Sequence, residues 1–304
     1  MKRTAIASLL LLLAVTVTSA QVVIIADDYN VTGNGTGFDL DTGVNSGINP
    51  PVTRLTGSAA DNLRYIQTGT GKAATAFSVT GNKLEVANAA GSGRFVLSAD
   101  GVTPYDFSSA LGIGSATPAN PVVYDITISM ANYASGIARF SFGLGTEDTT
   151  VDNQDFCLQL WRPTASADYY RIQKRIDTGS SGLAGDINDL IVDLPPGTRN
   201  TEVDFLIRIT DAGAETTTFS SQVQVSLDGG NTWLYDSSTD PALVNGWRLD
   251  GSERYFIWDQ APLTGTGRFT YDNFSVTMIP EPSTLALGLL GGLGMLLGRR
   301  SRHR

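Results

Sequence analysis

The stretch Tyr124-Asp125-Ile126-Thr127-Ile128-Ser129-Met130 alternates apolar and polar side chains without a break. Successive side chains of a β-strand point to opposite faces of its sheet, so a period of two predicts a strand with one buried face and one solvated face. The same alternation recurs at residues 138–144, 203–209 and 223–227. These segments favour antiparallel sheets that are buried on one side only.

Shorter β-rich runs fill most of the chain between these segments. We expect them at residues 22–26, 59–67, 75–79, 83–86, 94–97, 155–161, 169–174, 232–235, 254–258 and 268–278, with loops at 104–120 and 179–185. Gly81-Asn82 lies between two runs and has the residue types of a tight hairpin turn. Many short strands separated by turn residues predict an all-β chain folded as a two-sheet antiparallel sandwich.

The last run changes its pattern in the middle. Phe269 and Tyr271 share one parity, whereas Phe274 and Val276 share the other. The change falls at Asp272-Asn273, and it predicts either a β-bulge or a strand that passes from one sheet to the other.

Both ends of the chain have the composition of targeting segments. Residues 2–3 are basic, residues 5–17 are apolar and Thr18-Ser19-Ala20 are small, which predicts a secretory signal peptide over residues 1–20. At the other end, the uncharged segment 284–297 is shorter than the roughly 20 residues of a stable membrane span. Four arginines follow it, and such residues stay on the cytoplasmic side. We therefore expect a β-sandwich at 21–278 and a short, transiently inserted transmembrane helix within 279–304.

The C-terminal segment resembles the PEP-CTERM sorting signal, whose pattern is Val-Pro-Glu-Pro, an apolar helix and a basic end. Here the motif is Ile279-Pro280-Glu281-Pro282, so only its first position departs from the pattern. The resemblance implies cleavage near Pro280, Glu281 and Pro282 by an exosortase-type membrane protease. It also implies passage through the inner membrane to the cell surface or an extracellular matrix. An ordinary C-terminal anchor is the alternative.

Three stretches of the body, at 26–29, 78–86 and 271–276, resemble concanavalin A-like or laminin-G-like jelly rolls. In such folds the first and last strands are neighbours. The resemblance therefore implies that Asp27 and Asp28 lie near Asp272. Carboxylate oxygens in loops suit Ca²⁺, so these three residues are a candidate calcium site, with solvated turn residues as the alternative. No other cofactor is expected.

The net charge and the scarcity of histidine and cysteine exclude several classes of function. All 30 acidic residues and 15 of the 21 basic ones lie within residues 21–282, so this part of the chain carries a net charge of −15. This balance argues against nucleic acid as a partner. His303, in the tail, is the chain's one histidine, which removes histidine-dependent hydrolases and histidine-bound metals from the sandwich. Cys157 is also alone, and we expect a buried small apolar residue there.

Two motifs point weakly to enzymes. The stretch from Ser226 to Trp233 matches the Asp-box pattern Ser-x-Asp-x-Gly-x-Thr-Trp, which sialidases carry in several copies; a single copy is expected to be a stable hairpin. Glu202-Val203-Asp204 is similar to the start of the Glu-x-Asp-x-x-Glu strand of jelly-roll glucanases. Leu206 and Ile207 stand where its last carboxylate should fall, so the acid of a retaining pair is missing.

Aromatic side chains are the remaining candidates for ligand contact. Trp161, Tyr170 and Trp247 could stack on sugar rings, although aromatics in β-proteins are more often part of the core. The sequence as a whole predicts an exported structural or interaction protein of the surface or matrix, without catalysis. The alternatives are a carbohydrate-binding module that recognises extracellular polysaccharide and, less favoured, an enzyme active on glycosides.

Overall fold

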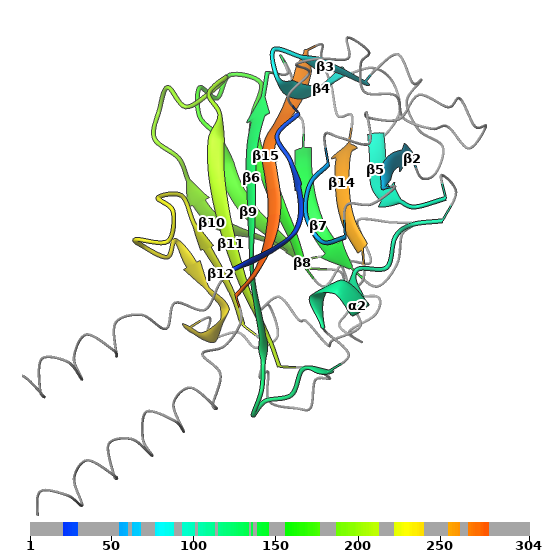
Figure 1. Ribbon diagram of the computed structural model, residues 1–304. Helices are drawn as coiled ribbons and strands as arrows, with labels where there is room; N and C mark the ends of the chain where they lie inside the picture. The colour runs from blue at the N-terminus through cyan, green and yellow to red at the C-terminus, as the bar shows by residue number, and fades with distance from the viewer. Residues whose placement is uncertain are drawn as a thin grey trace, which may run out of the picture. The chain divides into compact units, whose positions relative to one another are not determined.

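The computed structural model describes the chain in fourteen segments. They are residues 21–29, 55–59, 63–67, 77–87, 93–100, 103–112, 115–133, 135, 139–145, 156–176, 187–212, 222–239, 255–261 and 267–279. Within these segments nearly all regular structure is β, in two sheets (Figure 1).

The first sheet has eight strands. Its order is β13 (Tyr235–Asp236), β12 (Gln222–Ser226), β11 (Val203–Asp211), β6 (Val122–Asn132), β15 (Arg268–Ile279), β4 (Lys83–Ala87) and β3 (Phe77–Thr80), with β1 (Val22–Asp27) also paired to β15. The predicted neighbourhood of the first and last strands is therefore confirmed.

The second sheet has seven strands, and all its neighbouring strands are antiparallel. Its order is β10 (Ile187–Asp193), β9 (Arg171–Ile176), β8 (Phe156–Trp161), β7 (Arg139–Gly145), β14 (Tyr255–Ala261), β5 (Gly93–Ser98) and β2 (Arg64–Gln67). Two short helices complete the described elements, α2 (Ser108–Leu111) and η4 (Ser237–Thr239).

Aromatic side chains from the two sheets meet between them. The ring of Phe140 on β7 lies 4.9 Å from that of Phe269 and 4.0 Å from that of Tyr271, both on β15. Farther along, Phe142 on β7 lies 5.9 Å from Phe274 on β15. Face-to-face packing of this kind confirms the two-sheet antiparallel sandwich, an arrangement consistent with a jelly roll.

Trp258 on β14 lies in this core and has no exposed area. Its ring stacks on Phe95 at 5.3 Å, and the rings of Phe142 and Phe274 meet it edge-on at 5.4 and 4.8 Å. The indole Nε1 is buried and has no hydrogen-bond partner among the described residues. The contribution of this residue is therefore apolar contact area rather than polar bonding.

Most predicted strands are present, with four differences. The described part of the run 59–67 forms a strand only at Arg64–Gln67, the run 232–235 is replaced by a strand at Tyr235–Asp236, and the predicted loop 104–120 contains α2. Strand β10 was not predicted at all. Its pairing with β9 shifts register between Leu190 and Val192, and such a bulge destroys the period of two by which strands are recognised.

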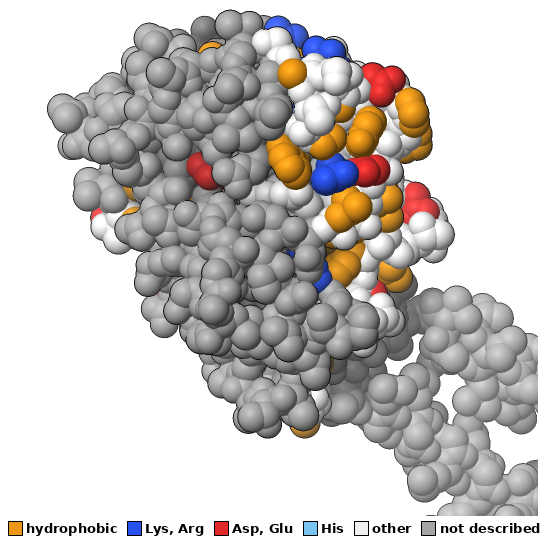
Figure 2. Space-filling model, turned by 180° about the vertical axis from the view of Figure 1, so that it is seen from behind, with side chains coloured by type: hydrophobic (Ala, Val, Ile, Leu, Met, Phe, Trp, Pro, Cys, Tyr) orange, Lys and Arg blue, Asp and Glu red, His pale blue; other side chains and the backbone are white. Residues whose placement is uncertain are grey.

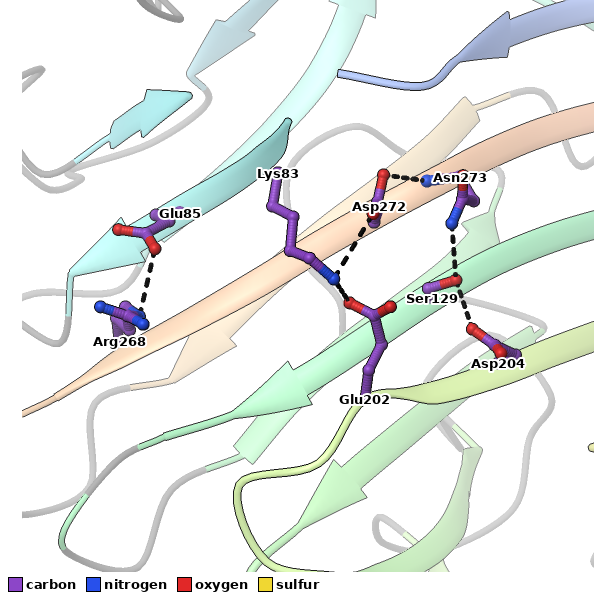
Figure 3. Close-up of polar contacts among 8 residues, drawn as sticks. All are labelled: Lys83, Glu85, Ser129, Glu202, Asp204, Arg268, Asp272 and Asn273. Atoms are coloured by element: carbon purple, nitrogen blue, oxygen red, sulfur yellow. Dashed lines mark hydrogen bonds and ion pairs between the residues drawn. The ribbon is translucent and has the colours of Figure 1, made fainter. Parts of the chain in front are cut away.

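The change of parity in β15 is a bulge, and the strand stays in one sheet. Asn273 has a φ of 51°, in the left-handed region that asparagine tolerates better than most residues. Tyr271 before it and Phe274 after it both belong to the core. Asp272 and Asn273 consequently point away from the core, at the surface of the eight-stranded sheet (Figure 3).

The chain divides into two compact units, Val23–Met278 and a second one formed by Met1–Val22 and Ile279–Arg304. The expected signal peptide, the motif residues Pro280, Glu281 and Pro282, and the apolar segment after them lie outside the described residues. Among the residues that are described, no helix combines the length and hydropathy of a membrane span.

Replacing Trp258 tests the dependence of the fold on its aromatic core. Trp258→Ala should lower the free energy of unfolding by about 3–5 kcal/mol, because it leaves a large cavity. Trp258→Phe should cost much less, since the Nε1–H that it removes has no partner. Urea denaturation of the two variants measures this difference. A loss for Trp258→Phe as large as that for Trp258→Ala would contradict this account.

Candidate functional site

The outer face of β6 and β11 is polar because both strands alternate. Their register places Asp125 opposite Arg208, Thr127 opposite Leu206 and Ser129 opposite Asp204. The intervening residues of both strands point into the core. One strand pair therefore supplies a buried apolar face and an outward row of hydrogen-bonding groups.

A pocket of about 460 Å³ opens on this outer face. It is lined by Asp125, Thr127, Ile128, Ser129, Asp204, Phe205, Leu206, Gly229 and Asn273. These residues come from β6, β11, β15 and the hairpin after β12. The pocket is thus built from rigid strands, with one wall contributed by a turn.

Ser129 connects three strands at the pocket. Its Oγ donates to Asp204 Oδ1 at 2.6 Å and accepts from Asn273 Nδ2 at 3.4 Å (Figure 3). Next to it, the hydroxyls of Thr127 and Ser275 lie 2.7 Å apart. The bulge at Asn273 thereby extends the row of polar groups from β6 and β11 onto β15.

Lys83 holds two carboxylates beside the pocket. Its Nζ is paired with Glu202 and lies 3.5 Å from Asp272 Oδ2 (Figure 3). Burial would lower the pKa of Lys83, but the two carboxylates outweigh this effect and raise it. Burial raises the pKa of Asp272, and the charge of Glu202 adds to the shift. The three side chains form an ion cluster with one excess carboxylate.

The Asp-box hairpin contributes Gly229 to the pocket lining, and Asp228 organises the hairpin. Asp228 Oδ1 accepts from the Thr232 amide at 2.9 Å, and Oδ2 accepts from the Thr232 hydroxyl at 2.7 Å. Ser226 Oγ lies 2.7 Å from Asp228 Oδ1 and accepts from the Gly230 amide at 2.9 Å. The bonds from Thr232 and Ser226 lower the pKa of Asp228 to about 2. The prediction of a stable hairpin is confirmed.

Arg208 joins the hairpin to the strands. Its guanidinium donates two hydrogen bonds to Asp125, each 2.8 Å long, and this contact raises the pKa of Arg208. Its other side faces Trp233, with the guanidinium carbon 5.3 Å from the ring centroid. Trp233 is half-buried, and the guanidinium lies over its ring as in a cation–π contact.

The carboxylates of the site are poorly arranged for glycoside hydrolysis. Asp125 and Asp204 are separated by four positions of the strand ladder, roughly 13 Å along the sheet. Retaining glycosidases use carboxyl groups about 5–5.5 Å apart, and inverting ones about 6.5–9.5 Å. Glu202 and Asp272 are nearer to each other, but the ammonium of Lys83 lies against both. The arrangement is suited to hydrogen bonding rather than to acid catalysis.

Two of the predicted aromatic residues lie away from this pocket. Tyr170 is fully buried; its hydroxyl accepts from the Asn132 amide at 3.0 Å and from the Asn200 amide at 2.9 Å. It fixes the loop that leads to Glu202 and presents no ring to a ligand. Trp161 lies on the outer side of the seven-stranded sheet, with the Arg171 guanidinium 5.8 Å from its ring. Trp247 lies outside the described residues.

The outer side of the seven-stranded sheet is different in character. The molecule seen from behind shows hydrophobic side chains gathered beside positively and negatively charged ones (Figure 2). On β10 of this sheet, Leu190 is 52% exposed. Arg171 on β9 pairs with Asp193 on β10 at 2.7 Å and lowers the pKa of that carboxyl. Cys157, on the same sheet, is buried among apolar residues, as predicted.

The three carboxylates of the candidate calcium site have separate roles. Asp27 is buried, and its carboxylate accepts from the Tyr29 amide at 2.8 Å and from the Tyr65 hydroxyl at 3.0 Å. Asp28 is exposed, and Asp272 belongs to the Lys83 cluster. Across the described segments, no three acidic, histidine or cysteine side chains are grouped so that they could hold a metal ion.

Sequence reasoning missed the residues that line the pocket. The alternation of polar and apolar residues could have indicated part of the lining, because it marks Thr127, Ser129 and Asp204 as outward-facing. Asn273 was noticed only as the position of a parity change. No local pattern indicates that β6 lies between β11 and β15.

The hairpin should respond to acid in a defined range of pH. The folded pKa of Asp228, about 2, is below the unfolded value of about 3.9. The carboxylate therefore adds stability that is complete above the unfolded value and is lost as the pH falls through the folded value. Unfolding free energies of the wild type and Asp228→Asn should differ most above pH of about 4 and converge toward pH of about 2. A difference independent of pH would contradict this assignment.

Comparisons with known proteins give the following likenesses. No family model matches the chain, and no curated protein matches it. Among solved structures, an endo-1,3-β-glucanase from Streptomyces sioyaensis is 11% identical, with a TM-score of 0.45 over 86% of this chain and 96% of that one. The alginate lyase Aly36B is 14% identical, with a TM-score of 0.43 over 84% and 96%. A CBM2 module of the evolved Dit of Lactobacillus casei BL23 phage J-1 is 13% identical, with a TM-score of 0.39 over 86% and 98%. At these values the likenesses carry no conclusion about what this chain binds.

Proposed function

We propose that this protein binds polysaccharide, without cleaving it, through the pocket on the outer face of the eight-stranded sheet. The observation that carries the proposal is the lining of that pocket. Hydroxyl, amide and carboxylate groups from Thr127, Ser129, Asp204 and Asn273 converge on about 460 Å³ of open space. A sugar ring presents many hydroxyls, and it can both donate to and accept from such a set.

The walls of the pocket support binding of a sugar. Leu206 adds apolar surface next to the polar groups. Sugars have apolar faces as well as polar edges, and ligand sites commonly combine apolar walls with a few oriented polar groups.

Binding without catalysis is favoured by the carboxylates. Asp125 is fully engaged by Arg208, and the Glu202–Asp272 pair is bridged by Lys83. No carboxyl pair at glycosidase spacing faces the pocket among the residues that line it.

Export and sorting remain part of the proposal on the basis of the termini. The signal-peptide pattern and the Pro280-Glu281-Pro282 tail support delivery by an exosortase-type protease to the cell surface or matrix. A polysaccharide-binding sandwich would then be released into the material that it binds. A purely structural role at the surface is the alternative, and it requires no glycan site.

Titration of the purified protein with a panel of neutral and acidic polysaccharides tests the binding site. Thr127→Gln extends a neutral side chain into the pocket and should weaken binding about 10-fold or more, since each lost hydrogen bond costs about 1 kcal/mol. Thr210→Gln is the matched control, because Thr210 lies on the same face of β11 but does not line the pocket.

Two results would contradict the proposal. Binding that is lost with Trp161→Ala but kept with Thr127→Gln would place the site on the other sheet. A flat titration with every polysaccharide of the panel would leave the structural role as the better account.

Mass spectrometry of the protein released by the cells that produce it tests the sorting proposal. The released chain should end near Pro280–Pro282, and Glu281→Ala should keep the tail attached. Ser283→Ala, just outside the motif, serves as the control. Finding Arg304 on the released protein would exclude processing of the tail.

A further inference from the structure

Charge is distributed unevenly around the pocket. Two of the lining residues are acidic, Asp125 and Asp204, and none is a lysine or an arginine among the residues described there. Asp125 is neutralised by its two hydrogen bonds to Arg208. Asp204 accepts a hydrogen bond from Ser129, a neutral group, and in the described part of the chain it forms no ion pair. Its charge therefore remains at the pocket.

The surroundings reinforce this negative potential. Glu202 and Asp272 share the single positive charge of Lys83, which leaves one negative charge on the cluster. Arg268 on β15 pairs with Glu85 on β4 at 3.2 Å, so together the two residues add no net charge (Figure 3). The whole body is acidic as well, at −15 for residues 21–282. An anionic polymer would meet repulsion both at long range and at the pocket.

We infer that the pocket selects uncharged polysaccharides over polyuronates, and that Asp204 is the residue that sets this selectivity. The inference rests on the proposed function and names the class of ligand. Asp204 has one oxygen engaged by Ser129, and its other oxygen is free to accept from a sugar hydroxyl. A carboxylate brought to the same position would face a like charge and would lose the water that hydrates both groups.

The inference predicts a reversal of preference in one variant. Wild-type protein should bind a neutral β-1,3-glucan and should bind alginate, a polyuronate, at least about 10-fold more weakly, because Asp204 accepts from a glucan hydroxyl but repels a carboxylate. Asp204→Asn keeps the shape but removes the charge. It should weaken glucan binding and strengthen alginate binding in the same titration.

A matched control separates local charge from net charge. Asp168→Asn removes the same unit of charge at an exposed residue that does not line the pocket, so both affinities should stay unchanged. Thermal melts of both variants show whether each is folded under the conditions of the titration.

Salt dependence of the unmodified protein gives a second measurement that needs no variant. Raising the salt concentration from about 0.15 M to about 1 M shortens the screening length from about 8 Å to about 3 Å. Alginate binding should rise, and binding of the neutral glucan should hardly change. Alginate binding that falls with salt would reveal a basic site and overturn the inference.

The outcomes distinguish the inference from the function on which it rests. Alginate bound as tightly as the glucan, with both weakened by Thr127→Gln, would keep the proposed function and refute the selectivity. If Asp204→Asn changes the affinities for glucan and alginate no more than Asp168→Asn does, Asp204 is not the residue that sets the selectivity. Failure of every polysaccharide to bind would overturn both.

Discussion

Strand β15 must bury aromatic side chains both before and after Asp272 and Asn273. The packing of the core and the composition of the pocket both depend on how it does so. Tyr271 and Phe274 both lie in the core although they are an odd number of positions apart. The left-handed conformation of Asn273 absorbs the extra residue. As a result, Tyr271 contacts Phe140 of the opposite sheet while Asp272 and Asn273 turn outward. Core packing and the composition of the pocket are thus two consequences of one bulge.

The charged side chains on the outer face orient groups more than they stabilise the fold. Arg208, Lys83 and Arg268 each pair with carboxylates at partly exposed positions. Ion pairs of this kind contribute about 0–1 kcal/mol each, far less than a buried aromatic residue such as Trp258. Their pattern matters for ligand choice, because it decides which carboxylates are neutralised. Asp125 is neutralised by Arg208, whereas Asp204 forms no ion pair with any described residue.

The sequence predicted individual elements better than their assembly. The alternation at 124–130 correctly separated the buried and outward residues of β6, and the Asp-box residues identified a hairpin from its own side-chain bonds. Strand β10 escaped detection because its bulge interrupts the alternation. The contact of Lys83 with Glu202 joins residues 119 positions apart, and nothing in either neighbourhood indicates the other. Tyr170, a candidate for ligand contact, is instead part of the core, and its hydroxyl is bonded to Asn132 and Asn200, which are distant from it in sequence.

By itself, the sequence determined the all-β class, the outward face of each alternating strand and the Asp-box turn. These properties follow from the pleat of a single strand, from bonds within a few residues, or from composition. Only the tertiary structure decided that β6 lies between β11 and β15 and that their polar rows form one pocket. The physical reason is that strand order is set by the packing of two aromatic faces, a property of the whole chain, whereas alternation is a property of each strand alone.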